Sequence, residues 1–320
     1  SDAVVLTYTS PMLTALAASL FLGEAWHSLD FFGSGLCLAG VMMISKPPAL
    51  FHLLGLQDQQ VELPPLGLAA AVAAATSATC VYVIIRILKD KDVHSLVFVN
   101  YLAMAAVVTA PAMGLGPFGE TWALPSWWAL ALLVALATLA SIGETLLAFG
   151  LKVETAAKAT SMNYLQVVFA FVFQRTLLHE SSSDFESKLG ALLISLWGLV
   201  ALSKEAWATQ GAQNAAGPKR EPLLSEKRPA ARPALSPGLL AMTLGAFFFS
   251  LMALLVKLLG HFGTYELVFW RSVFMFLGTM SMLAAKRINP LGPEGSRLLL
   301  WLRAAAGFGF MSGYYYAIQH

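Results

Sequence analysis

The chain has 320 residues and a formal net charge of +2; 58% of its residues are apolar or aromatic, and only 12% are charged. Soluble domains carry roughly 25% charged residues, so this composition and a mean hydropathy of +0.69 exclude a soluble globule, a disordered chain and a nucleic-acid-binding protein. Both cysteines, Cys37 and Cys80, lie in apolar runs, which favours neither a disulfide framework nor a metal cluster. The first residues lack a basic n-region, so no signal peptide is expected.

Continuous apolar runs predict an all-α integral membrane protein with ten transmembrane helices. A spanning helix needs about 20 apolar residues, whereas a barrel strand would alternate apolar and polar positions. In chain order, the helices are expected at 3–22, 31–45, 67–88, 94–113, 127–150, 155–178, 188–203, 238–259, 265–285 and 299–318. The runs 31–45 and 188–203 are short for a full crossing.

Residues 205–237 differ from all these runs, because they combine five prolines with five basic residues. This composition predicts a flexible basic linker between seven helices and three. Loops rich in Lys and Arg face the cytoplasm. A cytoplasmic linker puts most other loop cations on the same side, namely Arg86, Lys89, Lys91, Lys152, Lys286, Arg287 and Arg297. Both chain ends are then expected on the opposite face.

An internal repeat connects distant parts of the chain. Shifted by 171 residues, 67–98 aligns with 238–269 without a gap, which sets Arg86 on Lys257 and repeats a Leu-Val-Phe triplet. A weaker match follows a shift of 156–158 residues. The repeat predicts one five-helix unit at 67–204 and a second formed by 238–320 continued into 1–46. Because five is odd, the units have opposite orientations, which is typical of transporters.

Three runs resemble the EamA-type drug/metabolite transporter superfamily, and its solute carrier 35 G branch in particular. They are SDAVVLTYTSPMLTALAASLFLGE, ELVFWRSVFMFLG at 266–278 and GFGFMSGYYYAIQ at 307–319; the motifs are Pro11 followed by Gly23-Glu24, and Arg271. The resemblance implies ten helices, two inverted five-helix repeats and cytoplasmic termini. Here the order is circularly permuted. Residues 238–320 match the first three helices of the first repeat and 1–46 its last two.

Three explanations of the permuted order are open. The chain is a true permutation, a fragment of a tandem fusion, or the product of a mis-assembled gene model. In the first case 205–237 joins what would be the two cytoplasmic tails of the family.

Polar residues inside the spans are the candidate site, because ionisable groups in lipid are costly and often functional. Arg271 lies two turns into its helix, and the repeat pairs it with Asn100. The full set of candidate substrate-binding residues is Arg271, Lys158, Asn100, Asn163, Tyr164, Gln166, Tyr8, Ser10 and Trp270. Pro11 is expected inside its span, where it would free a carbonyl. The alternatives are that Arg271 is a structural anchor, that Lys158 lies at the membrane interface and that Pro11 only kinks its helix. Some of the aromatic residues would then belong to an interfacial aromatic belt.

Glu144 is the carboxylate deepest in a span. It is a candidate carrier of a coupling proton, because burial lets a carboxylate titrate near neutral pH; structural pairing with Lys158 or Arg271 is the alternative. Arg86, Lys257 and Arg303 lie near helix ends and are expected to snorkel, while Glu24 is expected to be a helix cap or a loop charge.

These features predict a secondary transporter of a small polar metabolite that works by alternating access. Arg271 and Lys158 outnumber Glu144 as deep charges, so the solute is expected to be anionic. No catalytic constellation is present, so neither an enzyme nor a cofactor is expected. The expected partners are a small molecule, a co-transported proton and the lipid bilayer. The alternatives are a seven-helix receptor formed by 1–204 and a non-transporting scaffold. The location is the endomembrane system or the plasma membrane.

Overall fold

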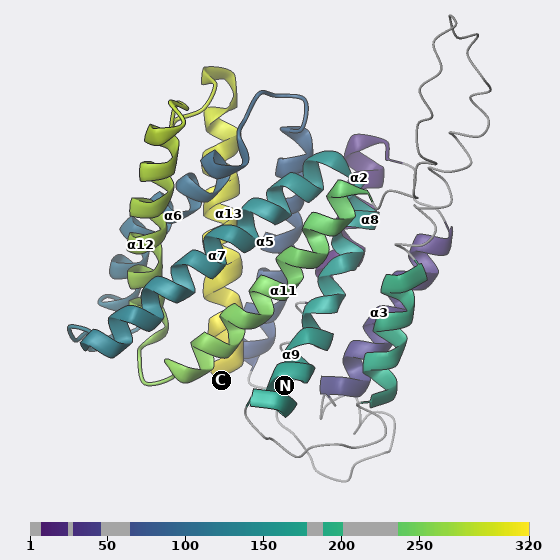
Figure 1. Ribbon diagram of the computed structural model, residues 1–320, viewed down its shortest axis with the longest axis horizontal. Coiled ribbons are helices and arrows are strands. Elements are labelled where there is room, and N and C mark those ends of the chain that lie inside the picture. Colours follow the sequence, from purple (N-terminus) through teal and green to yellow (C-terminus); the bar gives the residue numbers. More distant parts are fainter. Residues whose placement is uncertain (1–7, 25–27, 46–64, 178–187, 201–235, 320) are drawn as a thin grey trace, which may run out of the picture.

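The structure, a computed structural model, describes residues 8–24, 28–45, 65–177, 188–200 and 236–319, and within these ranges every regular element is a helix (Figure 1). The elements are α2 Ser10–Leu22, α3 Ser28–Ser45, α5 Pro65–Ile87, α6 Ser95–Gly114, α7 Trp127–Val153, α8 Ala156–Ser161, η1 Met162–Tyr164, α9 Leu165–Leu177, α11 Pro237–Leu258, α12 Thr264–Ala285, η2 Glu294–Ser296 and α13 Arg297–Gln319. A further helix covers Lys188–Val200.

A helix overlaps each of the ten predicted spans. Among the described residues, five helices are long and apolar enough to cross a membrane, namely Ala69–Ile87, Ser95–Gly114, Trp127–Val153, Pro237–Leu258 and Thr264–Ala285. Ser10–Leu22, Phe31–Ile44 and Lys188–Val200 are shorter apolar helices. The predicted linker lies outside the described residues, except for Ser236 and Pro237, and so do the two chain ends, Ser1 and His320. Pro237 begins α11, where a missing backbone N–H costs no helical hydrogen bond.

Two predicted helices differ in detail. Pro11 lies in the first turn of α2, with Thr9 as the N-cap, rather than in the middle of a longer helix. The span 155–178 is not one continuous helix, because the 3₁₀ turn η1 separates α8 from α9. At this break the Met162 amide donates to the carbonyls of both Ala159 and Thr160, which tightens the helix to i→i+3 geometry.

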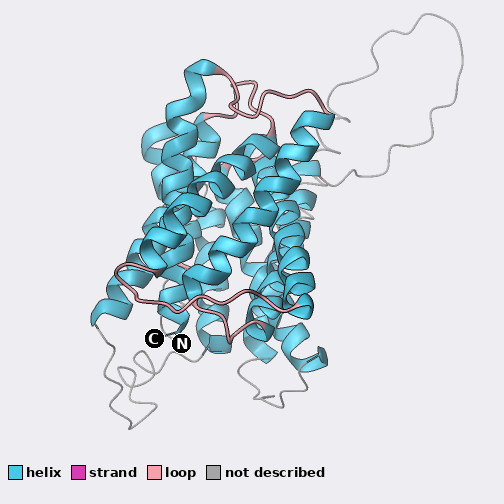
Figure 2. Ribbon diagram, turned by 90° about the vertical axis from the view of Figure 1, so that its left-hand side faces the viewer, coloured by secondary structure: helices cyan, strands magenta, loops and turns pink. Residues whose placement is uncertain are grey.

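The helices pack as a bundle (Figure 2), and the last three lie along earlier ones (Figure 1). Helix α11 packs along α7, α12 along α6, and α13 along α5; α9 lies against α11, and α2 against α5. The last three helices are therefore part of the same bundle as residues 65–177. A receptor formed by residues 1–204 alone would leave these packed faces uncovered.

One end of the bundle collects predicted cytoplasmic cations, and we call it the basic end: Arg86, Lys89, Lys91 and Lys152. The Lys152 ammonium donates to the Val93 carbonyl at 2.8 Å, and the Arg86 guanidinium donates to the Leu151 carbonyl at 2.9 Å. These bonds join the last turn of α7 to the last turn of α5 and to the loop that follows α5.

Helix α6 also begins at the basic end, and His94 caps it. Its Nδ1 accepts a hydrogen bond from the Leu96 amide at 3.2 Å. Burial lowers the pKa of His94, which favours the neutral imidazole that can accept this bond.

Close backbone contact between α3 and the helix Lys188–Val200 depends on glycine. A Cβ added to Gly40 would lie 2.8 Å from the Gly190 carbonyl oxygen, whereas a Cβ on Gly35 in the same helix would meet no atom within 4 Å. We expect Gly40→Ala to lower the free energy of unfolding by about 1–3 kcal/mol, the usual cost of overpacking. Gly35→Ala should be neutral or slightly stabilising. Thermal unfolding in detergent measures both; equal midpoints would contradict the close contact.

Candidate functional site

Helices from the beginning, middle and end of the chain surround a cavity with about 1010 Å³ of empty space, including the part open to its surroundings. Six of the predicted site residues line it: Tyr8, Ser10, Glu144, Asn163, Gln166 and Arg271. They come from the α2, α7, η1–α9 and α12 regions. Part of the predicted polar set therefore converges in space, although its members are scattered along the sequence.

Two of the other predicted residues, Asn100 and Trp270, are not among those that line the cavity. Asn100 is buried; its Oδ1 accepts from the Thr279 hydroxyl at 3.2 Å, and its Nδ2 donates to the Pro290 carbonyl at 3.5 Å. These bonds tie α6 to α12 and to the loop that follows it. The Trp270 ring packs against Phe269 and Phe274, at centroid distances of 5.4 and 6.5 Å.

Tyr164 and Lys158 are likewise not among the cavity-lining residues. Tyr164 is fully buried in an apolar cluster with Cys37 and Trp197, and its ring stacks on Tyr8 at a centroid distance of 6.4 Å. Lys158 is half-buried in α8, and its carbonyl accepts a hydrogen bond from the Ser161 hydroxyl at 2.8 Å.

Arg271 is the distinctive charge on the cavity wall. Its side chain is 2% exposed. Two guanidinium nitrogens point at methionine sulfurs, Nη1 at Met252 Sδ at 3.7 Å and Nη2 at Met311 Sδ, and Nε has no partner. Within the described residues, no carboxylate pairs with this guanidinium. Methionine sulfur is a weak acceptor, so Arg271 is a buried cation that no charge among the described residues balances.

Arg303 corrects a sequence-based expectation, because it does not snorkel. It is 1% exposed; its Nη2 donates to Glu144 Oε2 at 2.6 Å, and its Nη1 donates to the Phe98 carbonyl at 2.8 Å. Helix α13 begins at Arg297, which places Arg303 nearly two turns inside it. Arg303, rather than Lys158 or Arg271, is thus the partner of Glu144.

Sequence reasoning also missed Tyr82, which lines the cavity and whose hydroxyl accepts a hydrogen bond from Asn163 Nδ2 at 3.2 Å. Its signal in the sequence was a tyrosine in a largely apolar span. Leu102, Leu147, Phe249 and Phe310 supply apolar wall. The cavity thus combines a few polar groups with a largely apolar surface, as ligand sites do.

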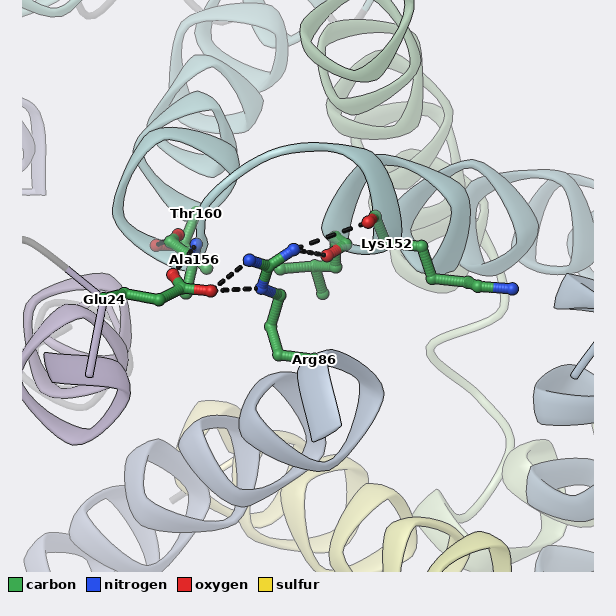
Figure 3. A network of polar contacts seen from close by, with 6 residues as sticks. Glu24, Arg86, Lys152, Ala156 and Thr160 are labelled. Carbon is green, nitrogen blue, oxygen red and sulfur yellow. Dashed lines mark hydrogen bonds and ion pairs between the residues drawn. The ribbon is translucent and has the colours of Figure 1, made fainter. Parts of the chain in front are cut away.

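At the basic end, Arg86 forms a buried polar network rather than snorkelling (Figure 3). It pairs with the Glu24 carboxylate and also donates to the carbonyls of Leu151 and Lys152, at 2.9 and 3.4 Å. Glu24 Oε2 accepts from the Ala156 amide at 2.8 Å, so this carboxylate caps α8, as one of its two predicted roles anticipated. The network joins the ends of α2, α5 and α7 to the beginning of α8.

A comparison with known protein families matches residues 1–46 and 65–203 to the EamA-like transporter family. A Saccharomyces cerevisiae protein named "Probable transport protein" is 32% identical over 190 residues, which are 56% of this chain and 54% of the yeast protein. Solute carrier family 35 member G1 of Homo sapiens is 29% identical over 177 residues, 54% of this chain and 47% of the human protein. The chain thus spans about half the length of the curated relatives it matches.

Proposed function

Because the chain belongs to the EamA-like transporter family, we propose that it is a secondary transporter that carries a small anionic solute across a membrane. The family and the apolar helices make it a multi-pass membrane protein whose expected activity is transport rather than catalysis. The basic end and the linker are assigned to the cytoplasm on the positive-inside rule. The membrane is that of an endomembrane compartment or of the cell surface.

The buried guanidinium of Arg271 carries the anionic assignment. A charge removed from water without a counter-ion is costly, and a bound carboxylate or phosphate would relieve that cost through two parallel hydrogen bonds. Glu144 and Arg303 balance each other at 2.6 Å, which leaves one positive charge among the described residues that line the cavity. The sequence-based count of deep charges used Arg271, Lys158 and Glu144. The count from the structure uses Arg303 in place of Lys158.

Alternating access between two inverted repeats is the proposed mechanism, and the packing supports it. The 171-residue shift exchanges α5 with α11 and α6 with α12; the same exchange would pair α13 with α7 and α2 with α9. Under it, the α11–α7 contact becomes α5–α13, the α11–α9 contact becomes α5–α2, and the α12–α6 contact maps onto itself. A two-fold related pair of five-helix units would have this pattern.

The Glu24–Arg86 network is the proposed contact that holds the basic end closed. Glu24 belongs to the unit formed by 238–320 and 1–46, whereas Arg86, Leu151 and Ala156 belong to the unit 67–204, so the contact would break when this side opens. We expect Glu24→Gln to favour opening about tenfold, because a hydrogen bond to a charged group contributes about 1.5–3 kcal/mol.

The readout uses a cysteine placed at Ala140, which lines the cavity. A maleimide is added on the side of the basic end, and the rate at which it labels this cysteine is measured. The background carries Cys80→Ser, because Cys80 is exposed. The control is Glu294→Gln, which removes an exposed pair with Arg297. A labelling rate that responds no more to Glu24→Gln than to Glu294→Gln would argue against the network as a closing contact.

Uptake by proteoliposomes that contain the purified chain tests the proposed function directly. Labelled solutes of similar size but different charge, namely organic acids, zwitterionic amino acids and organic amines, are offered under an imposed gradient. The expected result is that an organic acid accumulates in proteoliposomes and does not accumulate in liposomes without protein. Uptake confined to cations or neutral solutes would overturn the proposal.

A further inference from the structure

The ionised side chains among the described residues of the cavity wall leave a net charge of one positive unit. This net charge limits the charge of a ligand that matches the cavity. Among the lining residues that the structure describes, the acidic and basic side chains are those of Glu144, Arg271 and Arg303. Glu144 is already paired with Arg303. A single negative charge on the ligand would neutralise Arg271. A second would be buried without a counter-ion, in a cavity that also holds the Glu144 carboxylate, and is therefore disfavoured.

The surroundings of Arg271 further narrow the anionic group. A guanidinium fork matches the two oxygens of a carboxylate in one plane. A phosphate monoester carries about −1.5 to −2 charges near neutral pH, which exceeds the charge that the wall balances. The sulfurs of Met252 and Met311 flank the guanidinium and supply no donor for additional phosphate oxygens. The geometry therefore favours a carboxylate.

The rest of the wall matches an apolar body better than a sugar. Leu102, Phe249 and Phe310 line the cavity and would be covered by hydrocarbon or an aromatic ring. Each sugar hydroxyl would need a hydrogen-bond partner, because a buried unpaired hydroxyl is unfavourable. Two of the polar groups on the wall, the Tyr82 hydroxyl and the Asn163 amide, already bond to each other at 3.2 Å.

From these observations we infer that the solute is an organic monocarboxylate with an apolar body, bound with its carboxylate on Arg271 and its body against the apolar wall. The inference rests on the proposed transport function and adds the class of substrate to it. The inference excludes di- and tricarboxylates, sugar phosphates and zwitterionic amino acids as the preferred solute.

A competition series on the wild-type chain tests this inference without any variant that could misfold. The probe is labelled 3-phenylpropanoate taken up by proteoliposomes that contain the full chain. The competitors change one property at a time: 3-phenylpropanamide removes the charge, phenylsuccinate adds a second carboxylate, phenylalanine adds an ammonium group, and gluconate replaces the ring by a polyol. Glucose 6-phosphate replaces both the anionic group and the body.

We expect unlabelled 3-phenylpropanoate to compete at concentrations at least tenfold lower than any of the five others. Phe310→Ser should narrow the difference between 3-phenylpropanoate and gluconate, while Leu298→Ser, at an exposed site outside the cavity, should not. If phenylsuccinate, gluconate or glucose 6-phosphate competes best and Arg271→Lys weakens it, the inference falls while anion transport stands. If the amide competes as well as the acid, both the inference and the anionic assignment fail.

Discussion

Replacing Arg271 by lysine is expected to lower uptake of the anionic solute at least tenfold, although the substitution keeps the positive charge. The guanidinium is buried at 2% exposure, and within the described residues its hydrogen-bond partners are two methionine sulfurs. Its Nε has no partner there, so donors are available to a ligand. Lysine offers a point charge and cannot form two parallel bonds to one carboxylate. One lost hydrogen bond to a charged group corresponds to about 1.5–3 kcal/mol, which is tenfold or more in affinity.

The measurement is the concentration dependence of initial uptake rates in proteoliposomes with equal amounts of protein. Arg297→Lys is the matched control, because Arg297 is 37% exposed and pairs with a surface carboxylate at 3.5 Å; it should leave uptake unchanged. Thermal unfolding of both variants separates a binding defect from a folding defect. Uptake by Arg271→Lys that equals that of the control would remove Arg271 from the binding site.

The positions of the helices followed from apolar runs, because lipid exposure requires continuous apolar segments whatever their tertiary contacts. Where the sequence was insufficient, the cause was local hydrogen bonding. The break at η1 depends on how the amide of Met162 is shared between two carbonyls, a detail without a hydropathy signal. The position of Pro11 likewise depends on where α2 begins.

The candidate site was predictable in its polar residues but not in their pairing. Arg271, Glu144 and Asn163 carry the signal of a polar group deep in an apolar span, and they do line the cavity. Arg303 carried the same signal, but its depth depended on helix α13 beginning at Arg297 rather than at 299. Partners in a helical bundle are set by crossing geometry between distant segments, so sequence spacing could not identify the Glu144–Arg303 pair.

The second large effect is expected at this pair. Glu144→Gln should lower the free energy of unfolding by about 3–5 kcal/mol, because it leaves Arg303, 1% exposed, as an uncompensated buried charge. Adding Arg303→Met removes that charge and should restore most of the stability. Glu294→Gln, at an exposed pair, should cost no more than about 1 kcal/mol. Chemical or thermal unfolding in detergent gives the three values, and a cost for Glu144→Gln no larger than for Glu294→Gln would contradict the buried pair.

The same variants separate a structural pair from a proton-coupling one. If Glu144 carries a proton during transport, its protonation releases Arg303, and uptake by the wild-type chain should rise when an inward proton gradient is imposed. Glu144→Gln together with Arg303→Met should then abolish the response to the gradient while the solute still equilibrates. If Glu144 is only structural, the stable double variant should keep the wild-type response. The uptake ratio with and without the gradient therefore assigns the role, because a change in stability alone alters the amount of active protein and not this ratio.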